Sequence, residues 1–305
     1  MKRFFNLQRM NRTDFLKTLA LLPLTVAGMK LNYLHKVSDS LEKSDEMPVL
    51  FLGHGSPMNA IEENEFVRGF RQVGTSIPKP SAIICISAHW ETKGTYVTAM
   101  DHPKTIHDFG GFPKELFEVE YPAPGDPGLA RETKELVKKT QVGLDEKWGL
   151  DHGAWSVIKH LYPKADVPVI QMSIDYTQPA QYHYDLAKEL SSLRKKGMLI
   201  IGSGNMVHNL GMLAWDRLQD SEYGYDWALE ASTKMKQYIL NGDFKPLLNF
   251  RNQGRAFDLA IPTPEHYLPL IYALGLKGEK EKISLFNDKA LAGSLTMTSL
   301  KIDAV

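Results

Sequence analysis

Short apolar runs that end in small residues followed by a histidine constrain the fold of this chain more than any other feature. Residues 49–52 lead into His54, and residues 81–86 lead into His89. Both runs are too short for a free-standing helix and are almost wholly apolar, which is typical of strands buried on both faces of a sheet. Parallel strands joined by a helical crossover end at one edge of their sheet, so we expect His54 and His89 to converge.

The rest of the chain alternates further apolar runs with helical patterns. More buried strands are expected at 167–174 and 198–204, with strands nearer the sheet edges at 95–100, 283–286 and 294–302. Helices are expected at 61–73, 126–140, 155–161, 179–196 and 226–240, and a last helix begins near Pro264. This alternation predicts an α/β fold, a single domain whose mainly parallel central sheet is flanked by helices, with the ligand site at the C-terminal edge of the strands.

Composition excludes several classes of function. Thirty-six basic residues balance thirty-six acidic ones, so no net charge favours nucleic acid as a partner. The single cysteine, Cys85, lies inside an apolar run, which excludes a disulfide framework and a cysteine-based zinc site. Any metal must therefore be held by histidine and carboxylate. Nucleotide binding is not indicated either, because Gly202-Ser203-Gly204 lacks the third glycine of a dinucleotide motif.

The first 46 residues differ from the remainder. A basic segment precedes an apolar stretch at 15–28, the pattern of a secretory signal, and this stretch is too short for a stable membrane span. Residues 11–17 resemble a twin-arginine export signal in which Thr13 replaces one arginine, and no clean cleavage site follows. We therefore predict a signal-like leader and polar linker at 1–46 and a folded domain at 47–305, with export to the periplasm preferred to a cytoplasmic location.

Five of the ten histidines share a local context, since each lies at a strand end or a helix entry beside small or turn-forming residues. These are His54, His89, His152, His208 and His266. Taken singly, each is more often a hydrogen-bonded structural residue, but five at one edge of a parallel sheet favour a metal site because neutral imidazole is a good ligand. By contrast, His35, His160 and His183 lie in linker or helical surface contexts.

Aromatic residues accompany the histidines along the chain. They suit a pocket for an aromatic ring, although core packing accounts for them as well. They are Trp90, Phe109, Phe112, Trp155 and Tyr267.

At these residues the chain resembles the class III extradiol ring-cleavage dioxygenases, in the branch similar to 4,5-DOPA dioxygenase. The resemblance extends from about residue 47 to the C-terminus and depends on six motifs in the right order. The motifs are Gly53-His54-Gly55-Ser56-Pro57, Ser87-Ala88-His89-Trp90, Phe109-Gly110-Gly111-Phe112-Pro113, Leu150-Asp151-His152-Gly153-Ala154-Trp155, Gly202-Ser203-Gly204-Asn205-Met206-Val207-His208-Asn209-Leu210 and Pro262-Thr263-Pro264-Glu265-His266-Tyr267.

The resemblance implies a mononuclear metal at the sheet edge and assigns roles to the histidines. His54, His89 and His266 are implied as ligands. His208 matches a position that ligates in some relatives and acts as an acid/base in others, so it is a candidate for both roles. His152 matches the histidine that is implied to act on the catechol and dioxygen.

The implied activity is metal-dependent, extradiol ring opening of a catechol, similar to DOPA, with dioxygen. One divalent ion per chain, Zn²⁺ or Fe²⁺, is expected, because imidazole suits both metals while only iron has redox chemistry. Two alternatives use the same histidines: a zinc-dependent hydrolase and a non-catalytic metal-binding protein. The oligomeric state is not determined by these residues.

Overall fold

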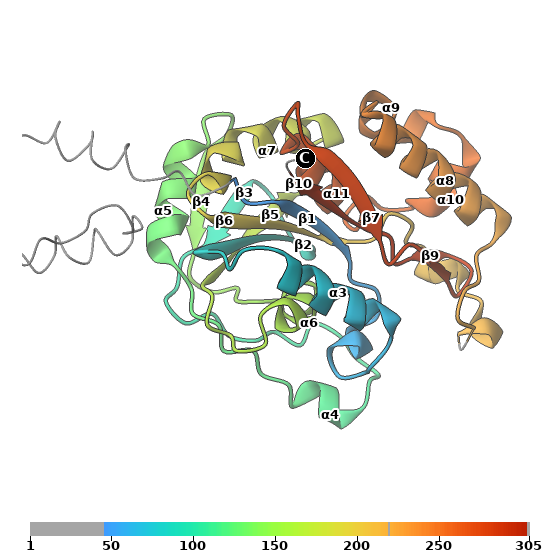
Figure 1. Cartoon of the computed structure of the whole chain (residues 1–305), viewed down its shortest axis with the longest axis horizontal. Coiled ribbons are helices and arrows are strands. Elements are labelled where there is room, and N and C mark those ends of the chain that lie inside the picture. Colours follow the sequence, from blue (N-terminus) through green and yellow to red (C-terminus); the bar gives the residue numbers. More distant parts are fainter. Residues whose placement is uncertain (1–45, 219, 304–305) are drawn as a thin grey trace, which may run out of the picture. The chain divides into compact units, whose positions relative to one another are not determined.

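The structure is a computed structural model that describes residues 46–218 and 220–303. From Met47 onward the described residues form one compact unit. Its centre is an eight-stranded sheet within these residues, in the order β4-β3-β5-β2-β6-β1-β10-β7 (Figure 1). The strands are β1 Val49–Gly53, β2 Ala82–Thr92, β3 Thr95–Thr98, β4 Val142–Asp145, β5 Val169–Asp175, β6 Met198–Gly204, β7 Lys282–Phe286 and β10 Ser299–Asp303. Beside them β8 Ala290–Leu291 pairs with β9 Leu295–Thr296.

The middle of the sheet is parallel, as the sequence predicted. Strands β5, β2, β6 and β1 run in one direction, whereas β3 and β10 join this group in antiparallel pairs. β1 and β2 are not neighbours, because β6 lies between them and pairs with both. The ends of β1, β2 and β6 therefore share one edge of the sheet, and the site lies at this edge. The α/β fold with a mainly parallel sheet is confirmed.

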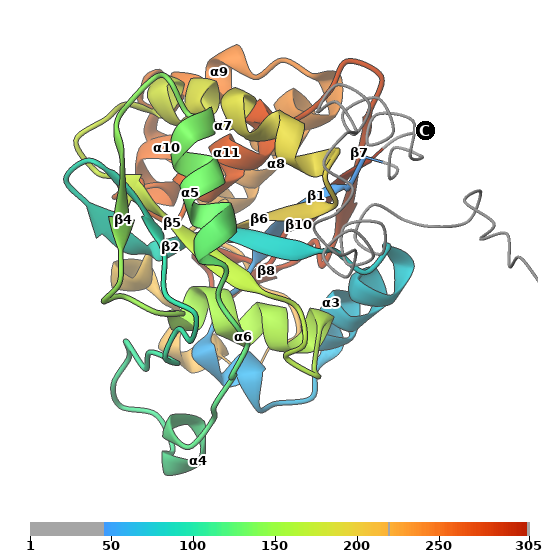
Figure 2. The ribbon, with the colours of Figure 1, turned by 90° about the vertical axis from the view of Figure 1, so that its left-hand side faces the viewer.

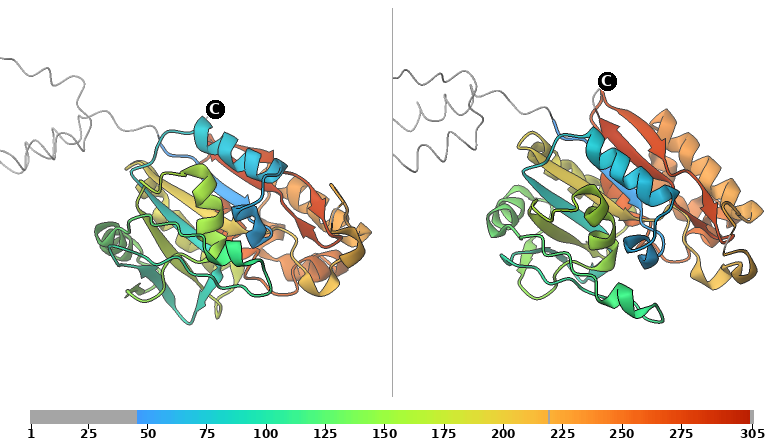
Figure 3. Two further views of the ribbon diagram at one scale, coloured as in Figure 1. Left: turned by 90° about the horizontal axis from the view of Figure 1, so that it is seen from below. Right: turned by 60° about the horizontal axis from the view of Figure 1, so that its bottom comes forward.

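Helices cover both faces of the sheet. They are α3 Glu65–Ser76, α4 Lys114–Phe117, α5 Pro127–Leu136, α6 His152–Leu161, α7 Ala180–Arg194, α8 Asp226–Asn241, α9 Lys245–Leu248, α10 Arg255–Ala260 and α11 Leu268–Gly275, with 3-10 turns η2 Pro57–Ala60, η3 Leu210–Met212, η4 Trp215–Arg217 and η5 Phe250–Asn252. α3 and α6 lie on one face, and α7 and α11 lie on the other (Figures 1 and 2). The left panel of Figure 3, in which the ribbon is seen from below, shows α3 and α6 in front of their face of the sheet.

The residues of β1 illustrate why the strands are apolar throughout. Leu50 and Leu52 belong to the core beneath α3 and α6, whereas Val49 and Phe51 belong to the core under α7 and α11, and all four are fully buried. Successive side chains of a strand point to opposite faces, so a sheet covered on both faces needs apolar residues at every position. At roughly 25 cal/mol per Å² of apolar surface, each such side chain contributes about 1.5–3 kcal/mol on burial.

Several predicted element boundaries were wrong. The helix expected at 61–73 is α3, which covers Glu65–Ser76 and begins after Asn64, whose side chain caps it by accepting a hydrogen bond from the Val67 N–H. The helix expected to reach residue 140 ends at Leu136, and β4 follows it. The last helix, α11, begins at Leu268 and not near Pro264.

Two histidines expected on helical surfaces are buried. Nε2 of His160 lies 2.7 Å from the carbonyl oxygen of Asn59, and Nδ1 of His183 lies 3.1 Å from the Tyr272 hydroxyl. His35 and the predicted leader and linker fall outside the described residues. Among the residues that are described, no helix is both long enough and apolar enough to cross a membrane.

Candidate metal centre

Three histidines meet at the edge where the parallel strands end. His54 follows β1, His89 lies near the end of β2, and His266 precedes α11. One ring nitrogen from each lies within 4.8 Å of the other two, and Nε2 of His54 is 3.3 Å from Nε2 of His89. His54 is 2% exposed and His266 is 8% exposed, so the cluster is largely shielded from solvent.

The outer nitrogen of each of these rings faces an oxygen. Nδ1 lies 3.0 Å from Ser203 Oγ in His54, 3.4 Å from Asp108 Oδ2 in His89 and 3.0 Å from Glu265 Oε1 in His266. An oxygen acceptor at Nδ1 holds the proton there and leaves the lone pair of Nε2 free, which is the usual arrangement around a metal-binding imidazole. All three rings are therefore suited to present Nε2 to one ion.

The hydrogen-bond chain behind His54 decides its tautomer. The Ser203 hydroxyl donates to the carbonyl oxygen of Gly153, so its oxygen is left to accept from Nδ1–H of His54. The backbone of the same histidine is fixed as well, because its N–H donates to the Gly204 carbonyl and its carbonyl accepts from Asn59 Nδ2. The β1–β6 pairing thus sets both the position and the proton of His54.

Two glycines allow this close packing. A Cβ at Gly204 would overlap the carbonyl oxygen of His266, whose position next to β6 is fixed by the Asn205 N–H. A Cβ at Gly153 would lie 2.7 Å from Cδ2 of His89 and 2.5 Å from Ser87 Oγ. Both glycines are therefore required by close approach, and both belong to the motifs that carry the resemblance.

His152 enters the site from the first residue of α6. The preceding Asp151 caps that helix, accepting from the Ala154 N–H, and its carboxylate is fully buried among hydrogen bonds from Ser87 and Gln171. The ring of His152 lies 3.9 Å from that of His89 between centroids, and it is 5% exposed. Its Nδ1 is 3.0 Å from Asp108 Oδ1, although its N–H does not point straight at that oxygen.

His208 occupies a different position from the three converging histidines. Its ring stacks on that of His266 at 3.5 Å between centroids and 10° between planes. One of its ring nitrogens groups with a ring nitrogen of His266 and a carboxylate oxygen of Glu265, and not with the ring nitrogens of His54 and His89. The structure thus brings His208 to the site, but on the outer side of His266.

Burial makes the cluster favour neutral imidazoles. The pKa values of His54 and His89 are held well below the ordinary histidine value. Loss of solvation is the larger cause, and repulsion from the charge on neighbouring histidines is the smaller one. Burial and His266 likewise lower the pKa of His208 to about 3. For Glu265, burial opposes ionisation, but hydrogen bonds from His266 and the backbone outweigh it and lower the pKa to about 2. Neutral imidazoles beside an ionised carboxylate are the protonation states that a divalent cation needs.

The aromatic neighbours divide into core residues and residues near the site. Trp90, Trp155 and Tyr267 are buried, and the latter two donate to backbone carbonyls, so they are core residues. Phe109 contacts His152 edge to face at 5.4 Å between centroids, and Phe112 packs on Phe109 at 5.5 Å. Of these five aromatic residues, Phe109 is therefore the one whose ring contacts His152, and Phe112 packs behind it.

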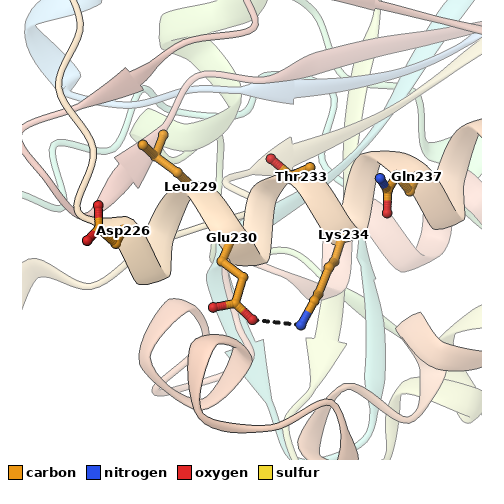
Figure 4. Close-up of a pocket in the computed structure, with 6 residues that line it drawn as sticks. All are labelled: Asp226, Leu229, Glu230, Thr233, Lys234 and Gln237. Atoms are coloured by element: carbon orange, nitrogen blue, oxygen red, sulfur yellow. Dashed lines mark hydrogen bonds and ion pairs between the residues drawn. The ribbon is translucent and has the colours of Figure 1, made fainter.

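Sequence reasoning missed the oxygens that orient the rings. Asp108 and Ser203 stand beside or within the motifs, but which ring nitrogen each one faces depends on the fold. A separate depression along α8 contains none of the histidines and is lined by Asp226, Leu229, Glu230, Thr233, Lys234 and Gln237 (Figure 4). Its polar contact is the helix-surface ion pair between Glu230 and Lys234 at 2.6 Å, which indicates a solvated helix face.

Comparison with known proteins identifies the family. Residues 48–295 match the family model described as the catalytic LigB subunit of aromatic ring-opening dioxygenase. Curated relatives include the 4,5-DOPA dioxygenase extradiol of Escherichia coli K12, 44% identical over 87% of this chain and 98% of the relative, and that of Beta vulgaris, 36% identical over 82% and 94%. The crystal structure of an uncharacterized protein from Escherichia coli K12 matches with a TM-score of 0.70 and 40% identity over 84% of this chain and 99% of that one. The chain therefore belongs to the LigB family of aromatic ring-opening dioxygenases, in the class III extradiol branch that its motifs predicted.

Proposed function

We propose that this enzyme opens the ring of a catechol, with a side chain like that of DOPA, by extradiol cleavage at one divalent ion held by His54, His89 and His266. The observation that carries the proposal is the convergence of one ring nitrogen from each of three histidines, while Nδ1 of each ring faces an oxygen. The names of the curated relatives support the substrate class.

The residues present fit such an ion. Two nitrogens that each lie about 2.0–2.1 Å from one tetrahedral ion are roughly 3.3–3.4 Å apart, and Nε2 of His54 and Nε2 of His89 are 3.3 Å apart. Two neutral nitrogens whose protons are both held elsewhere would repel at this distance, and a cation between them removes that repulsion. The site therefore has the donor set and spacing of a three-histidine centre.

When bound there, iron(II) would supply a Lewis acid and an electron-transfer centre for the catechol and dioxygen, whereas zinc would supply Lewis acidity alone. We propose that iron is the working metal, because ring cleavage with dioxygen needs redox chemistry. An ion held by three protein side chains would keep coordination positions open for the substrate. His208 stacks on the outer side of His266, so it is then not required as a ligand. We propose that it acts on the substrate instead.

His152 is the residue we assign to proton transfer. Asp108 faces its Nδ1, which leaves Nε2 as the nitrogen that accepts a hydroxyl proton from the catechol and returns it later in the reaction. General acid–base catalysis by a positioned histidine contributes about 10²–10⁴-fold. Phe109, packed against the ring of His152, presents an apolar surface on which the catechol ring can lie.

The test is to load the protein anaerobically with iron(II) and then to measure oxygen uptake and the yellow semialdehyde absorbance with a panel of catechols that includes DOPA. Absence of turnover across the panel, with iron confirmed bound, would refute the proposal. Turnover that is independent of oxygen and supported by zinc would indicate the hydrolase instead.

Paired variants separate the two roles. His89→Ala is expected to lose the metal, whereas His152→Ala is expected to keep it and to lose about 10²–10⁴-fold in kcat. His102→Ala, on an exposed part of the loop before α4, serves as the matched control and should retain both. A fully active His152→Ala enzyme would show that the proton-transfer assignment is wrong.

A further inference from the structure

We infer that Asp108 is a positioning residue that fixes the proton-bearing nitrogens of His89 and His152 together, so that one loop carboxylate orients both a metal ligand and the proton-transfer residue. This inference rests on the proposed roles of those two histidines. Neither the sequence motifs nor the ligand set of the proposed metal site gives this acidic residue a role.

The carboxylate of Asp108 lies between the two rings. Oδ2 is 3.4 Å from Nδ1 of His89, and Oδ1 is 3.0 Å from Nδ1 of His152. Oδ1 also accepts the backbone N–H of His152 at 2.9 Å. The side chain of Asp108 is 19% exposed, so water competes weakly for these oxygens.

The backbone contact places Asp108 at the start of α6. The N–H of His152 is the first of that helix, and an unpaired N–H at a helix N-terminus favours a negative charge by about 0.3–1 kcal/mol. Asp151 caps the same end through the Ala154 N–H. Two carboxylates therefore hold the first turn of α6, but Asp108 alone contacts the rings, while Asp151 contacts Ser87, Gln171 and Trp148.

A carboxylate is suited to this position because both of its oxygens only accept. The negative charge of the carboxylate favours the proton on Nδ1 of both rings, although the Nδ1–H of His152 is not aligned with Oδ1, and this tautomer leaves Nε2 of His89 free for the metal and Nε2 of His152 free for the substrate. An asparagine side chain has one accepting oxygen, so its NH₂ group would face one of the two rings. That ring would have to move its proton to Nε2, the tautomer in which Nε2 neither binds metal nor accepts a proton.

The same loop carries the aromatic residues beside the site. Phe109 follows Asp108 directly and packs on His152, and Phe112 packs on Phe109. The loop between β3 and α4 thus positions the carboxylate and the apolar surface as one segment. Its own anchor to the protein includes the contact between Nε2 of His107 and the Val119 carbonyl at 2.9 Å.

The experiment compares Asp108→Asn and Asp108→Ala with Asp101→Asn, a matched control on the same loop that is exposed and whose described hydrogen bond uses only its backbone carbonyl. Affinity for cobalt(II) or zinc is measured by anaerobic titration, together with the visible spectrum of the cobalt form and the thermal unfolding of the metal-free protein. Replacing a residue that orients a metal ligand typically costs 10–100-fold in metal affinity or activity.

We expect Asp108→Asn to bind metal about 10–100-fold more weakly and to give a changed cobalt spectrum. With saturating iron, its kcat for a catechol should fall by more than its KM changes, while Asp101→Asn matches the wild type throughout. Wild-type metal affinity and an unchanged cobalt spectrum in Asp108→Asn would overturn the inference. A loss confined to the thermal midpoint would also overturn it, because that is the result of a merely structural role. If the wild-type enzyme turns over no catechol, the metal titration and the spectrum still decide the role of Asp108.

Discussion

Replacing Gly153 by alanine tests whether α6 holds His89 in place. Gly153 is the second residue of α6, and the added Cβ would lie 2.7 Å from Cδ2 of the His89 ring and 2.5 Å from Ser87 Oγ. Ordinary carbon–carbon contacts begin near ~3.5 Å, so the ring must move by roughly 0.8 Å or the helix must withdraw by that amount. We expect the His89 ring to be displaced, because Ser87 is tied to the fully buried Asp151 by a hydrogen bond of 2.6 Å.

Two opposing contributions set the expected stability. Alanine is favoured over glycine in a helix interior by about 1 kcal/mol, and by less in the first turn. Overpacking a close-packed site costs about 1–3 kcal/mol, so we expect a net loss of up to about 2 kcal/mol in the free energy of unfolding. The effect on function should be larger, because a displacement of about 1 Å can reduce a rate about 10²-fold.

The assay compares Gly153→Ala with Gly128→Ala in α5, where the added Cβ meets only the Asp126 side chain, at 3.1 Å. Anaerobic metal titration, oxygen uptake with a catechol and urea unfolding are measured for both. We expect weaker metal binding and about 10²-fold lower kcat in the first variant, and wild-type values in the second. Wild-type metal affinity and kcat in Gly153→Ala would refute the reasoning that α6 positions His89.

Three further outcomes follow from other parts of the structure. Ser203→Ala should weaken metal binding about 10–100-fold, measured by titration, because it removes the acceptor at Nδ1 of His54; unchanged affinity would show that this hydroxyl does not set the tautomer. Arg194→Leu should cost about 3–5 kcal/mol in urea unfolding, since it leaves Glu281 and two backbone carbonyls without their buried partner; a loss below 1 kcal/mol would contradict this. The pKa of His208 is lowered to about 3, so the folded metal-free protein binds fewer protons than the unfolded chain below the ordinary histidine pKa. The contribution of His208 to the free energy of unfolding should therefore fall by about 1.4 kcal/mol for each pH unit between ~6.5 and about 3, and His208→Leu should reduce the measured slope of unfolding free energy against pH by this amount.

The sequence predicted the elements whose patterns are strongest. The apolar runs at β1, β2, β5 and β6 are buried on both faces, so composition alone marks them as central strands. β4 was missed because Val142-Gly143-Leu144-Asp145 is short, half polar and at the sheet edge, where packing imposes no continuous apolar run. The late start of α11 has a local cause, since Pro269 stands in its first turn and Pro264 accepts the bonds of a preceding turn.

The histidines of the site were predictable, but their relations were not. Their positions at strand ends placed all five at one edge, as the structure finds. Which rings converge depends on β6 lying between β1 and β2, and strand order is a tertiary property that local pattern does not contain. The same holds for Asp108, which is one more polar residue in a turn-rich loop until the fold brings α6 against it.

The position of β6 between β1 and β2 also determines when the site can exist during synthesis. His54 and His89 leave the ribosome early, but β6, which separates their strands, follows roughly 145 residues after His54, and the His266 segment follows roughly 210 residues after His54. At about 5–20 residues per second this is a delay of roughly 10–40 s. Through that interval the nascent chain holds only part of the proposed ligand set and two strands that have no direct pairing with each other, so a metal at the proposed site gains its full set of histidine ligands only after the His266 segment has emerged.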